Sequence, residues 1–217
     1  MKPTMHKHAI SGVLIGAWLS ALGGCAPPTP GPGTGLHVFA ALDASASWRP
    51  GLAATASLCA QQAGELNPAA DQLTLYRLDD RLQEFSSGPA PDDPDTIQQT
   101  LNTQLLAVSP GRGTFPARFW TTVANRAQTD HCPAVIELFS DGDNDDQAAQ
   151  SKHAICGAVR KLAANPRVRS VCLFGVQPRN WAYWRDCLRP LGDRAHLFSP
   201  TELSSDIVTH ALEQARP

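Results

Sequence analysis

The chain has 217 residues, enough for one domain of ordinary size together with a short additional segment. Its 18 Lys and Arg residues nearly balance 20 Asp and Glu residues and form no basic block, which argues against nucleic acid as a ligand. Hydrophobic residues make up 42% of the chain, so it can form a packed core and is not disordered as a whole.

The first residues have the composition of an export signal. Two lysines and no acid precede an uncharged, mostly apolar run over 9–22, which is shorter than the roughly 20 residues of a membrane-spanning helix. The run ends in LGGC over 22–25, which resembles a bacterial lipobox. This resemblance implies a signal peptide over 1–24 and a mature chain that begins at lipidated Cys25. An ordinary secretory cleavage site with an incidental Cys is the alternative.

Proline and glycine dominate the segment that follows Cys25. Residues 26–35 contain four prolines and three glycines, a composition that separates a domain from its anchor rather than packing into a core. We therefore expect a tether over 25–35 and one folded domain over 36–217, exported and anchored to the cell envelope. The membrane is contacted only through the N-terminal lipid. Ala26 favours the periplasmic side of the outer membrane if the cell is Gram-negative.

The remaining residues alternate between short apolar runs and helical periodicity, which is typical of α/β domains. Apolar stripes at helical spacing predict helices around 52–66, 155–162 and 203–212, and Phe115-Pro116 marks the start of another. A short run after the two acids at 79–80 predicts a hairpin with an antiparallel edge strand. The expected fold is a doubly wound, mostly parallel six-stranded sheet with that antiparallel edge strand and with helices on both faces. The runs that predict the other five strands cover 37–42, 73–78, 134–139, 170–176 and 195–198.

Three polar segments lie where such a sheet binds its ligands, outside the carboxyl ends of its strands. They are DASAS at 43–47, SDGD at 140–143, and GRGT at 111–114. Together they resemble the metal ion-dependent adhesion site of von Willebrand factor A (vWA) domains, with its D-x-S-x-S pattern, its Thr after a glycine-rich loop, and its Asp followed by Gly. The resemblance covers nearly all of 36–217 and implies a Rossmann-like vWA fold. The metal site that it implies consists of Asp43, Ser45, Ser47, Thr114 and Asp141.

The resemblance also implies the chemistry of that site. Mg²⁺ is the expected ion, with Mn²⁺ as the alternative, because a hard cation prefers oxygen ligands. Ser45, Ser47 and Thr114 would offer hydroxyls directly, while Asp43 and Asp141 would hold bound waters. An ion without a directly bound carboxylate would accept one from a partner. We therefore expect a protein-binding module, not an enzyme, whose partner is an envelope or extracellular protein that offers Asp or Glu. A metal-independent scaffold and a metal-assisted hydrolase are the alternatives.

Each residue also has a simpler explanation when it is considered alone. Thr114 could cap the helix that begins after it, Asp141 with Gly142 could form an ordinary turn, and Asp43 could cap the next segment. Asp43 could also be the nucleophile of a haloacid dehalogenase phosphatase, but those enzymes need a second Asp where this chain has Ser45. An EF-hand beginning at Asp141 fails because its loop lacks the required Gly and Glu.

Two further residues are candidates for contact with a partner. Arg112 stands where many relatives have Gly, and we expect it to point outward, where it could pair with an acidic partner. Trp181 follows the fifth predicted strand together with Tyr183 and Trp184, so this aromatic group could reach the rim of the site. A helix that buries two of the three against the sheet is, however, the commoner outcome for such residues.

Five cysteines follow Cys25, so at least one is not in an intrachain disulfide. They form no C-x-x-C motif and no Cys/His spacing typical of zinc. The helices around Cys156 and Cys187 should lie side by side on one face of a doubly wound sheet, which makes these two the first candidates for a disulfide. Cys172 lies in an apolar run and is expected to be a buried free thiol. The other two are Cys59 and Cys132.

Overall fold

The computed structural model describes residues 35–145 and 149–216. The predicted signal peptide over 1–24, the predicted lipidation at Cys25 and the tether up to residue 34 lie outside the described residues. Among the residues that are described, no helix is long and apolar enough to cross a membrane.

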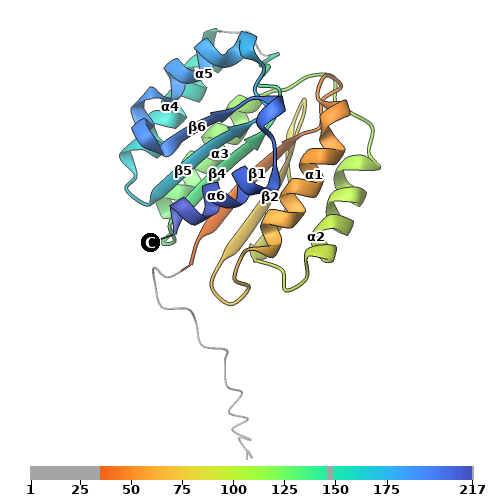
Figure 1. Ribbon diagram of the computed structural model, residues 1–217. Coiled ribbons are helices and arrows are strands. Elements are labelled where there is room, and N and C mark those ends of the chain that lie inside the picture. Colours follow the sequence, from red (N-terminus) through yellow and green to blue (C-terminus); the bar gives the residue numbers. More distant parts are fainter. Residues whose placement is uncertain (1–34, 146–148, 217) are drawn as a thin grey trace, which may run out of the picture.

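A six-stranded sheet forms the centre of the molecule, in the order β3-β2-β1-β4-β5-β6 (Figure 1). Its neighbouring strands are parallel except for β2 and β3, which form the predicted antiparallel hairpin at one edge. The predicted fold class is thus confirmed. The strands are β1 (His37–Asp43), β2 (Gln72–Leu78), β3 (Leu82–Pro89), β4 (Ala134–Phe139), β5 (Val168–Phe174) and β6 (Ala195–Phe198).

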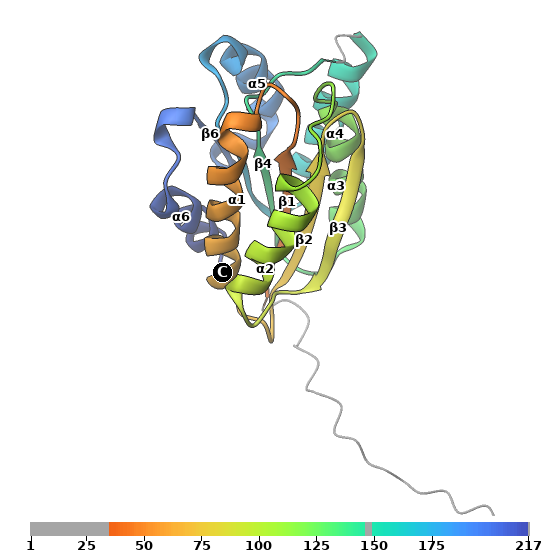
Figure 2. The same ribbon diagram turned by 90° about the vertical axis from the view of Figure 1, so that its right-hand side faces the viewer.

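Helices cover both faces of the sheet (Figures 1 and 2). On one face lie α1 (Arg49–Gly64), α2 (Pro94–Leu101), a π-helical turn η1 (Asn102–Leu106) and α6 (Ser205–Ala215). On the other face lie α3 (Pro116–Thr129), α4 (Ala149–Ala164) and α5 (Trp181–Leu188). Short 3₁₀ turns precede and follow β6 and precede α5: η2 (Pro178–Asn180), η3 (Arg189–Arg194) and η4 (Pro200–Glu202).

Burial on both faces explains why the central strands are almost entirely apolar. In β1, Val38, Ala40 and Leu42 pack on the side of α1 and α6. Phe39 and Ala41 alternate with them and pack on the side of α3 and α4. The edge strand β3 is largely exposed or half-buried, and its sequence is correspondingly mixed.

Two details differ from the expectations. The strand expected over 170–176 is β5, which begins at Val168 and ends at Phe174, because Gly175 turns the chain with φ +91°. Helix α2 was not expected from the sequence, since only Ile97 and Leu101 form its buried side. Its start did carry a local signal: the Asp93 side chain accepts a hydrogen bond from the backbone at the amino end of the helix, and Pro94 follows.

The disulfide expected between α4 and α5 is present. It joins Cys156 to Cys187, whose Cα atoms are 5.0 Å apart. Cys172 is buried and free, as predicted, and Cys59 and Cys132 are also free in the described structure.

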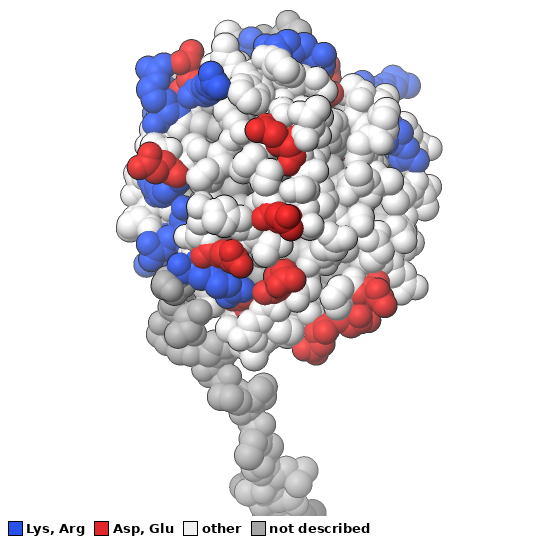
Figure 3. Space-filling view, in the orientation of Figure 1, with Lys and Arg blue, Asp and Glu red and all other residues white. Residues whose placement is uncertain are grey.

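Charge is distributed unevenly over the face formed by α1, α2 and α6. Helix α1 has a single charged residue, Arg49, whereas α6 contains Asp206 and Glu213 but neither Lys nor Arg. Figure 3 shows acidic side chains along the middle of this face and mostly uncharged surface beside them. Uncharged surface therefore extends over most of α1.

Candidate metal site

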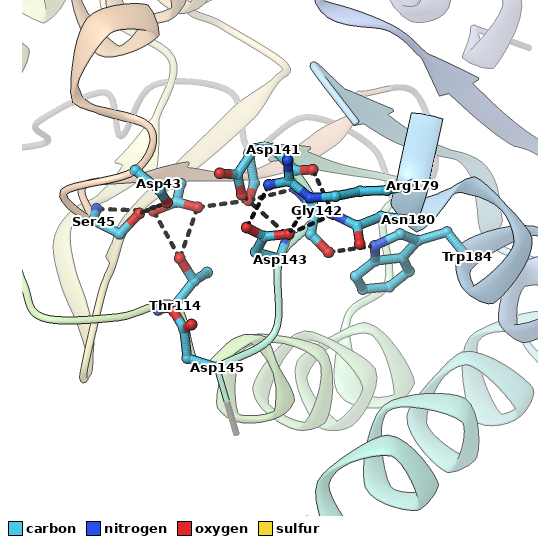
Figure 4. Close-up of polar contacts among 12 residues, drawn as sticks. Asp43, Ser45, Thr114, Asp141, Gly142, Asp143, Asp145, Arg179, Asn180 and Trp184 are labelled. Carbon is cyan, nitrogen blue, oxygen red and sulfur yellow. Dashed lines mark hydrogen bonds and ion pairs between the residues drawn. The ribbon is translucent and has the colours of Figure 1, made fainter. Parts of the chain in front are cut away.

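Asp43 lies at the centre of the predicted metal site, at the carboxyl end of β1. Its side chain is fully buried. Its Oδ2 accepts hydrogen bonds from the hydroxyls of Thr114, at 3.0 Å, and Ser140, at 2.6 Å, and its Oδ1 accepts one from the Ser45 backbone N–H, at 2.8 Å (Figure 4). Because Leu42 pairs with Phe139 in parallel register, Asp43 and Ser140 leave the sheet side by side. One carboxylate therefore gathers three segments of the chain.

The loop that carries Thr114 is held against the sheet by backbone contacts. Gly111 donates its N–H to the Ala44 carbonyl at 3.1 Å. A Cβ at Gly111 would lie 2.3 Å from the Asp79 side chain, so this approach requires glycine. Phe115, not Thr114, occupies the N-cap position of α3, and the Thr114 hydroxyl donates to Asp43 instead. The helix-cap explanation of Thr114 is therefore wrong.

The remaining predicted residues continue the same network. The Oγ atoms of Ser45 and Ser47 are 3.1 Å apart. Burial raises the pKa of Asp141, and a hydrogen bond from the Ser47 side chain offsets part of that rise. Asp141 is buried, and its Oδ1 accepts the backbone N–H of Asp143 at 3.0 Å. Ser47 is exposed, so the network reaches the surface there. The structure thus brings all five predicted residues together at one edge of the sheet.

The two buried carboxyls carry an electrostatic cost. Burial raises the pKa of Asp43 to about 6, against the lowering effect of its hydrogen bonds from Ser140 and Ser45, and the charge of Asp141 raises it further. Burial likewise raises the pKa of Asp141, and the nearby charge of Asp143 adds to that effect. A cation between the carboxyls would offset both costs.

Asp143 lies at the rim of the site and already has a cationic partner. Its Oδ2 pairs with Nη2 of Arg179 at 2.7 Å, and its Oδ1 accepts a hydrogen bond from Asn180 Nδ2 at 2.6 Å (Figure 4). Burial tends to raise the pKa of Asp143, but these hydrogen bonds outweigh it and the pKa is lowered. Arg179 and Asn180 were missed in the sequence analysis. Their position shortly after β5 could have identified them, because the residues that follow each parallel strand lie at this edge of the sheet.

Among the aromatic residues of α5, Trp184 supports the site, and Tyr183 lines a hollow beside it. Trp184 is fully buried, and its Nε1 donates to the Gly142 carbonyl at 2.9 Å, which braces the turn after Asp141. Trp181 and Tyr183 are half-buried. The Trp181 Nε1 donates to the Val176 carbonyl, and the Arg185 guanidinium lies 4.8 Å from the Trp181 ring centroid. Thus one of the three aromatic residues is fully buried, where burial of two was expected, and the predicted contact of Trp181 with a partner stays a prediction.

Arg112 is exposed on the loop before Thr114. It lines a hollow of about 410 Å³ together with Arg77 and Arg81. The Arg77 side chain pairs with Asp79 at 2.7 Å and donates to the Ser109 carbonyl, which holds the loop in place. Arg112 therefore points into solvent near the site, and its predicted contact with a partner stays a prediction.

The donor atoms at this edge suit a hard cation, because they are hydroxyl and carboxylate oxygens. Within the described ranges, no group of three or more His, Cys, Asp or Glu side chains is arranged to hold a metal ion. A metal at this edge would therefore depend on the hydroxyls of Ser45, Ser47 and Thr114 as well as on the two carboxylates.

No family model matches the chain, and no curated protein matches it in sequence. Solved structures match its fold. A von Willebrand factor type A protein from Catenulispora acidiphila is 11% identical, with a TM-score of 0.59 over 83% of this chain and 42% of that chain. Proximal thread matrix protein 1 from the mussel byssus, in a structure with zinc in its metal ion-dependent adhesion site (MIDAS) motif, is 14% identical. Its TM-score is 0.56 over 83% of this chain and 45% of that chain.

A third match is the manganese-loaded TRAP protein of Plasmodium vivax, which is 12% identical, with a TM-score of 0.58 over 84% of this chain and 74% of that chain. This chain spans less than half the length of the first two matched chains. Identities this low bear on architecture alone, and the architecture is the same in all three. The chain therefore has the fold of von Willebrand factor A domains.

Proposed function

We propose that this chain is a divalent-metal-dependent protein-binding module of the bacterial cell envelope, in which an acidic side chain of the partner completes the coordination of the metal. The observation that carries the proposal is the convergence of Asp43, Ser45, Ser47, Thr114 and Asp141 into one hydrogen-bonded network. Residues 71 positions apart in the chain, Asp43 and Thr114, are in direct contact there.

The residues fit a metal of the Mg²⁺ or Mn²⁺ type. Thr114 and Ser45 are buried, whereas Ser47 is exposed at the surface. Asp43 accepts hydrogen bonds from three donors, the Thr114 and Ser140 hydroxyls and the Ser45 backbone N–H. Because it holds the two hydroxyls in place, it is less free to bind the ion itself. When bound, the cation would supply a positive charge that an external carboxylate can neutralise. Zinc and manganese in two of the matched structures support a divalent ion at this kind of site.

Binding rather than catalysis is the proposed role because the carboxylates of the site are already engaged: Asp43 accepts hydrogen bonds from Thr114 and Ser140, and Asp143 pairs with Arg179. His37 lies at the start of β1, six residues from Asp43 along an extended strand and hence about 20 Å away. It is buried, pairs with Asp130 and is hydrogen-bonded to Thr74 at 2.9 Å. These three residues therefore lie at the amino end of β1 and take no part in the candidate site.

The envelope location rests on the sequence of the first 35 residues, with its lipobox-like LGGC and its proline-rich tether. Residues 35 and 36 enter the sheet at the amino end of β1. The candidate metal site lies at the opposite, carboxyl end of that strand. A lipid anchor at Cys25 would therefore leave the site facing away from the point of attachment, where a partner can reach it.

Metal titration of the purified chain from Ala26 to Pro217 tests the metal-binding part of the proposal. We expect saturable binding of one Mn²⁺ or Mg²⁺ by isothermal titration calorimetry, weakened by about tenfold or more in Asp43→Asn, because the neutral amide removes a charge beside the cation. Asp71→Asn is the matched control, since Asp71 is equally buried but lies at the other end of the sheet. No uptake by the wild-type chain, or equal losses in the two variants, would contradict a metal at this edge.

Crosslinking and capture from an envelope extract tests the partner. The partners of the wild-type chain should be lost with Asp43→Ala and with a chelator. Partner sets that are the same in all three conditions would rule out the metal bridge.

A further inference from the structure

We propose, on the basis of the function proposed above, that the partner binds as an extended segment whose acidic residue reaches the metal while a neighbouring large apolar side chain enters an adjoining groove. The groove has a volume of about 810 Å³. It lies between the first half of α1 and the segment that joins β6 to α6. Its described lining consists of Ser47, Trp48, Pro50, Gly51, Ala54, Ser57, Leu58, Asp141, Gln177, Arg179, Pro200 and Leu203.

The groove begins at the metal site itself. Ser47 and Asp141, two of the five candidate metal residues, form part of its wall. Arg179 lies at the same end. It forms an ion pair with Asp143, and 63% of its side chain is exposed to solvent. A divalent cation bound here would bring positive charge to this end, and the exposed guanidinium of Arg179, although it is paired with Asp143, lies beside it. An acidic side chain is the complementary group.

The other end of the groove is apolar. Leu58 and Leu203 are partly buried and pack against the core, and Pro50, Ala54 and Pro200 complete this wall. Among the described lining residues, Asp141 is the sole carboxylate and Arg179 the sole cation, both at the metal end. Figure 3 shows the same lack of charge over α1. Apolar surface of this kind favours an apolar side chain.

The floor of the groove is formed by a buried aromatic ring. Trp48 follows directly after Ser47, is 6% exposed and packs between Gly51 and Gly175. A Cβ at Gly175 would lie 2.3 Å from the Trp48 ring, so the glycine is what admits the indole. A preformed floor lowers the ordering cost of binding. Since Trp48 belongs to the loop that carries the serines, the floor of the groove is continuous with its metal end.

The size of the groove limits what it can hold. A volume of about 810 Å³ is within the range of sites that enclose small ligands, so the groove can hold a few side chains on a short stretch of chain but not a folded partner. The occupant is therefore an extended segment of a partner with Asp or Glu close in sequence to Leu, Ile, Met or Phe. The metal orients the segment, and the apolar side chain adds affinity and selectivity.

Selection from a library of random short peptides displayed on phage, with the Ala26–Pro217 chain as bait in Mg²⁺, tests this inference. We expect enriched peptides that pair an acidic residue with a large apolar residue at a fixed spacing. An enriched synthetic peptide then serves as the probe, and its affinity is measured by fluorescence anisotropy with Mg²⁺ and with chelator.

Ala54→Arg blocks the groove without removing a core contact, since Ala54 is exposed on α1 and lines the groove. Ala53→Arg is the matched control: the same charge is added at the neighbouring exposed position, which is not part of the lining. We expect Ala54→Arg to weaken binding of the peptide by about tenfold, the scale of one buried apolar side chain. Ala53→Arg should leave it within about twofold, and both variants should bind Mg²⁺ as the wild type does.

The outcomes separate the groove from the metal. Enrichment of acidic residues alone, with no effect of Ala54→Arg, would overturn the groove and leave the proposed function in place. Apolar peptides that bind equally in chelator would overturn the metal-dependent function. A selection that enriches nothing would overturn the inference that a linear segment is recognised.

Discussion

Glu137 offers the sharpest test of the energetics of this fold. It lies in the middle of β4, with no exposed surface, and its Oε1 accepts a hydrogen bond from Gln62 of α1. Its Oε2 has no hydrogen-bond partner among the described residues. Burial raises the pKa of Glu137 from 4.5 to about 8, although the Gln62 hydrogen bond acts in the opposite direction. The folded protein therefore holds a neutral carboxylic acid in its core at neutral pH.

The consequence is a stability that falls as the pH rises. Between pH 4.5 and about 8 the unfolded chain releases this proton while the folded chain keeps it, so the free energy of unfolding decreases with pH through that window and then levels off. At about 1.4 kcal/mol per pH unit, the full window corresponds to about 5 kcal/mol, as an order of magnitude. Below pH 4.5 both states are protonated and the contribution is fully present.

Glu137→Gln removes this dependence because the amide keeps the shape and stays neutral. We expect the variant to be close to the wild type in stability near pH 4.5 and more stable by several kcal/mol at pH 8 to 9, by about 5 at most. Urea unfolding followed by circular dichroism across this range measures the difference. Glu213→Gln, at an exposed position on α6, is the control and should run parallel to the wild type. A Glu137→Gln curve that also runs parallel would refute the reasoning.

Two further predictions concern the backbone and the disulfide. Gly175→Ala places a Cβ at φ +91° and 2.3 Å from the Trp48 ring. We expect the free energy of unfolding to fall by about 2 kcal/mol or more, as measured by thermal unfolding. Gly157→Ala is the control: a Cβ there has no atom near it, so this variant should be neutral or slightly stabilising. Replacing both Cys156 and Cys187 by Ser should cost about 2 to 4 kcal/mol, measured by denaturant unfolding, and an unchanged midpoint would contradict a disulfide between α4 and α5.

Much of the fold could be predicted from the sequence because burial leaves a local pattern. The central strands β1 and β4 are apolar on both faces, so each appears as an uninterrupted run with nearly correct bounds. Helix α1 shows its buried side at helical spacing. Helix α2 escaped notice because it is short and buries one narrow side, although Asp93 and Pro94 marked its beginning.

The candidate site could be predicted in its composition but not in its contacts. The spacing of Asp43, Ser45 and Ser47 is local and legible in the sequence, and Thr114 and Asp141 follow from the resemblance to vWA domains. That Asp43 accepts hydrogen bonds from both Thr114 and Ser140 depends on the register of β1 with β4 and on the close approach allowed at Gly111.

The positions of the strands along the chain, their two apolar faces and the residue types at the carboxyl edge were thus determined by the sequence itself, since each depends on neighbours within a few positions. Tertiary structure alone decided that Glu137 is buried beneath Gln62, that Arg179 neutralises Asp143, and that a groove opens beside the metal residues. Each of these features brings together side chains that are far apart in the chain. No local periodicity in the sequence predicts such contacts, because they form only when strands and helices pack.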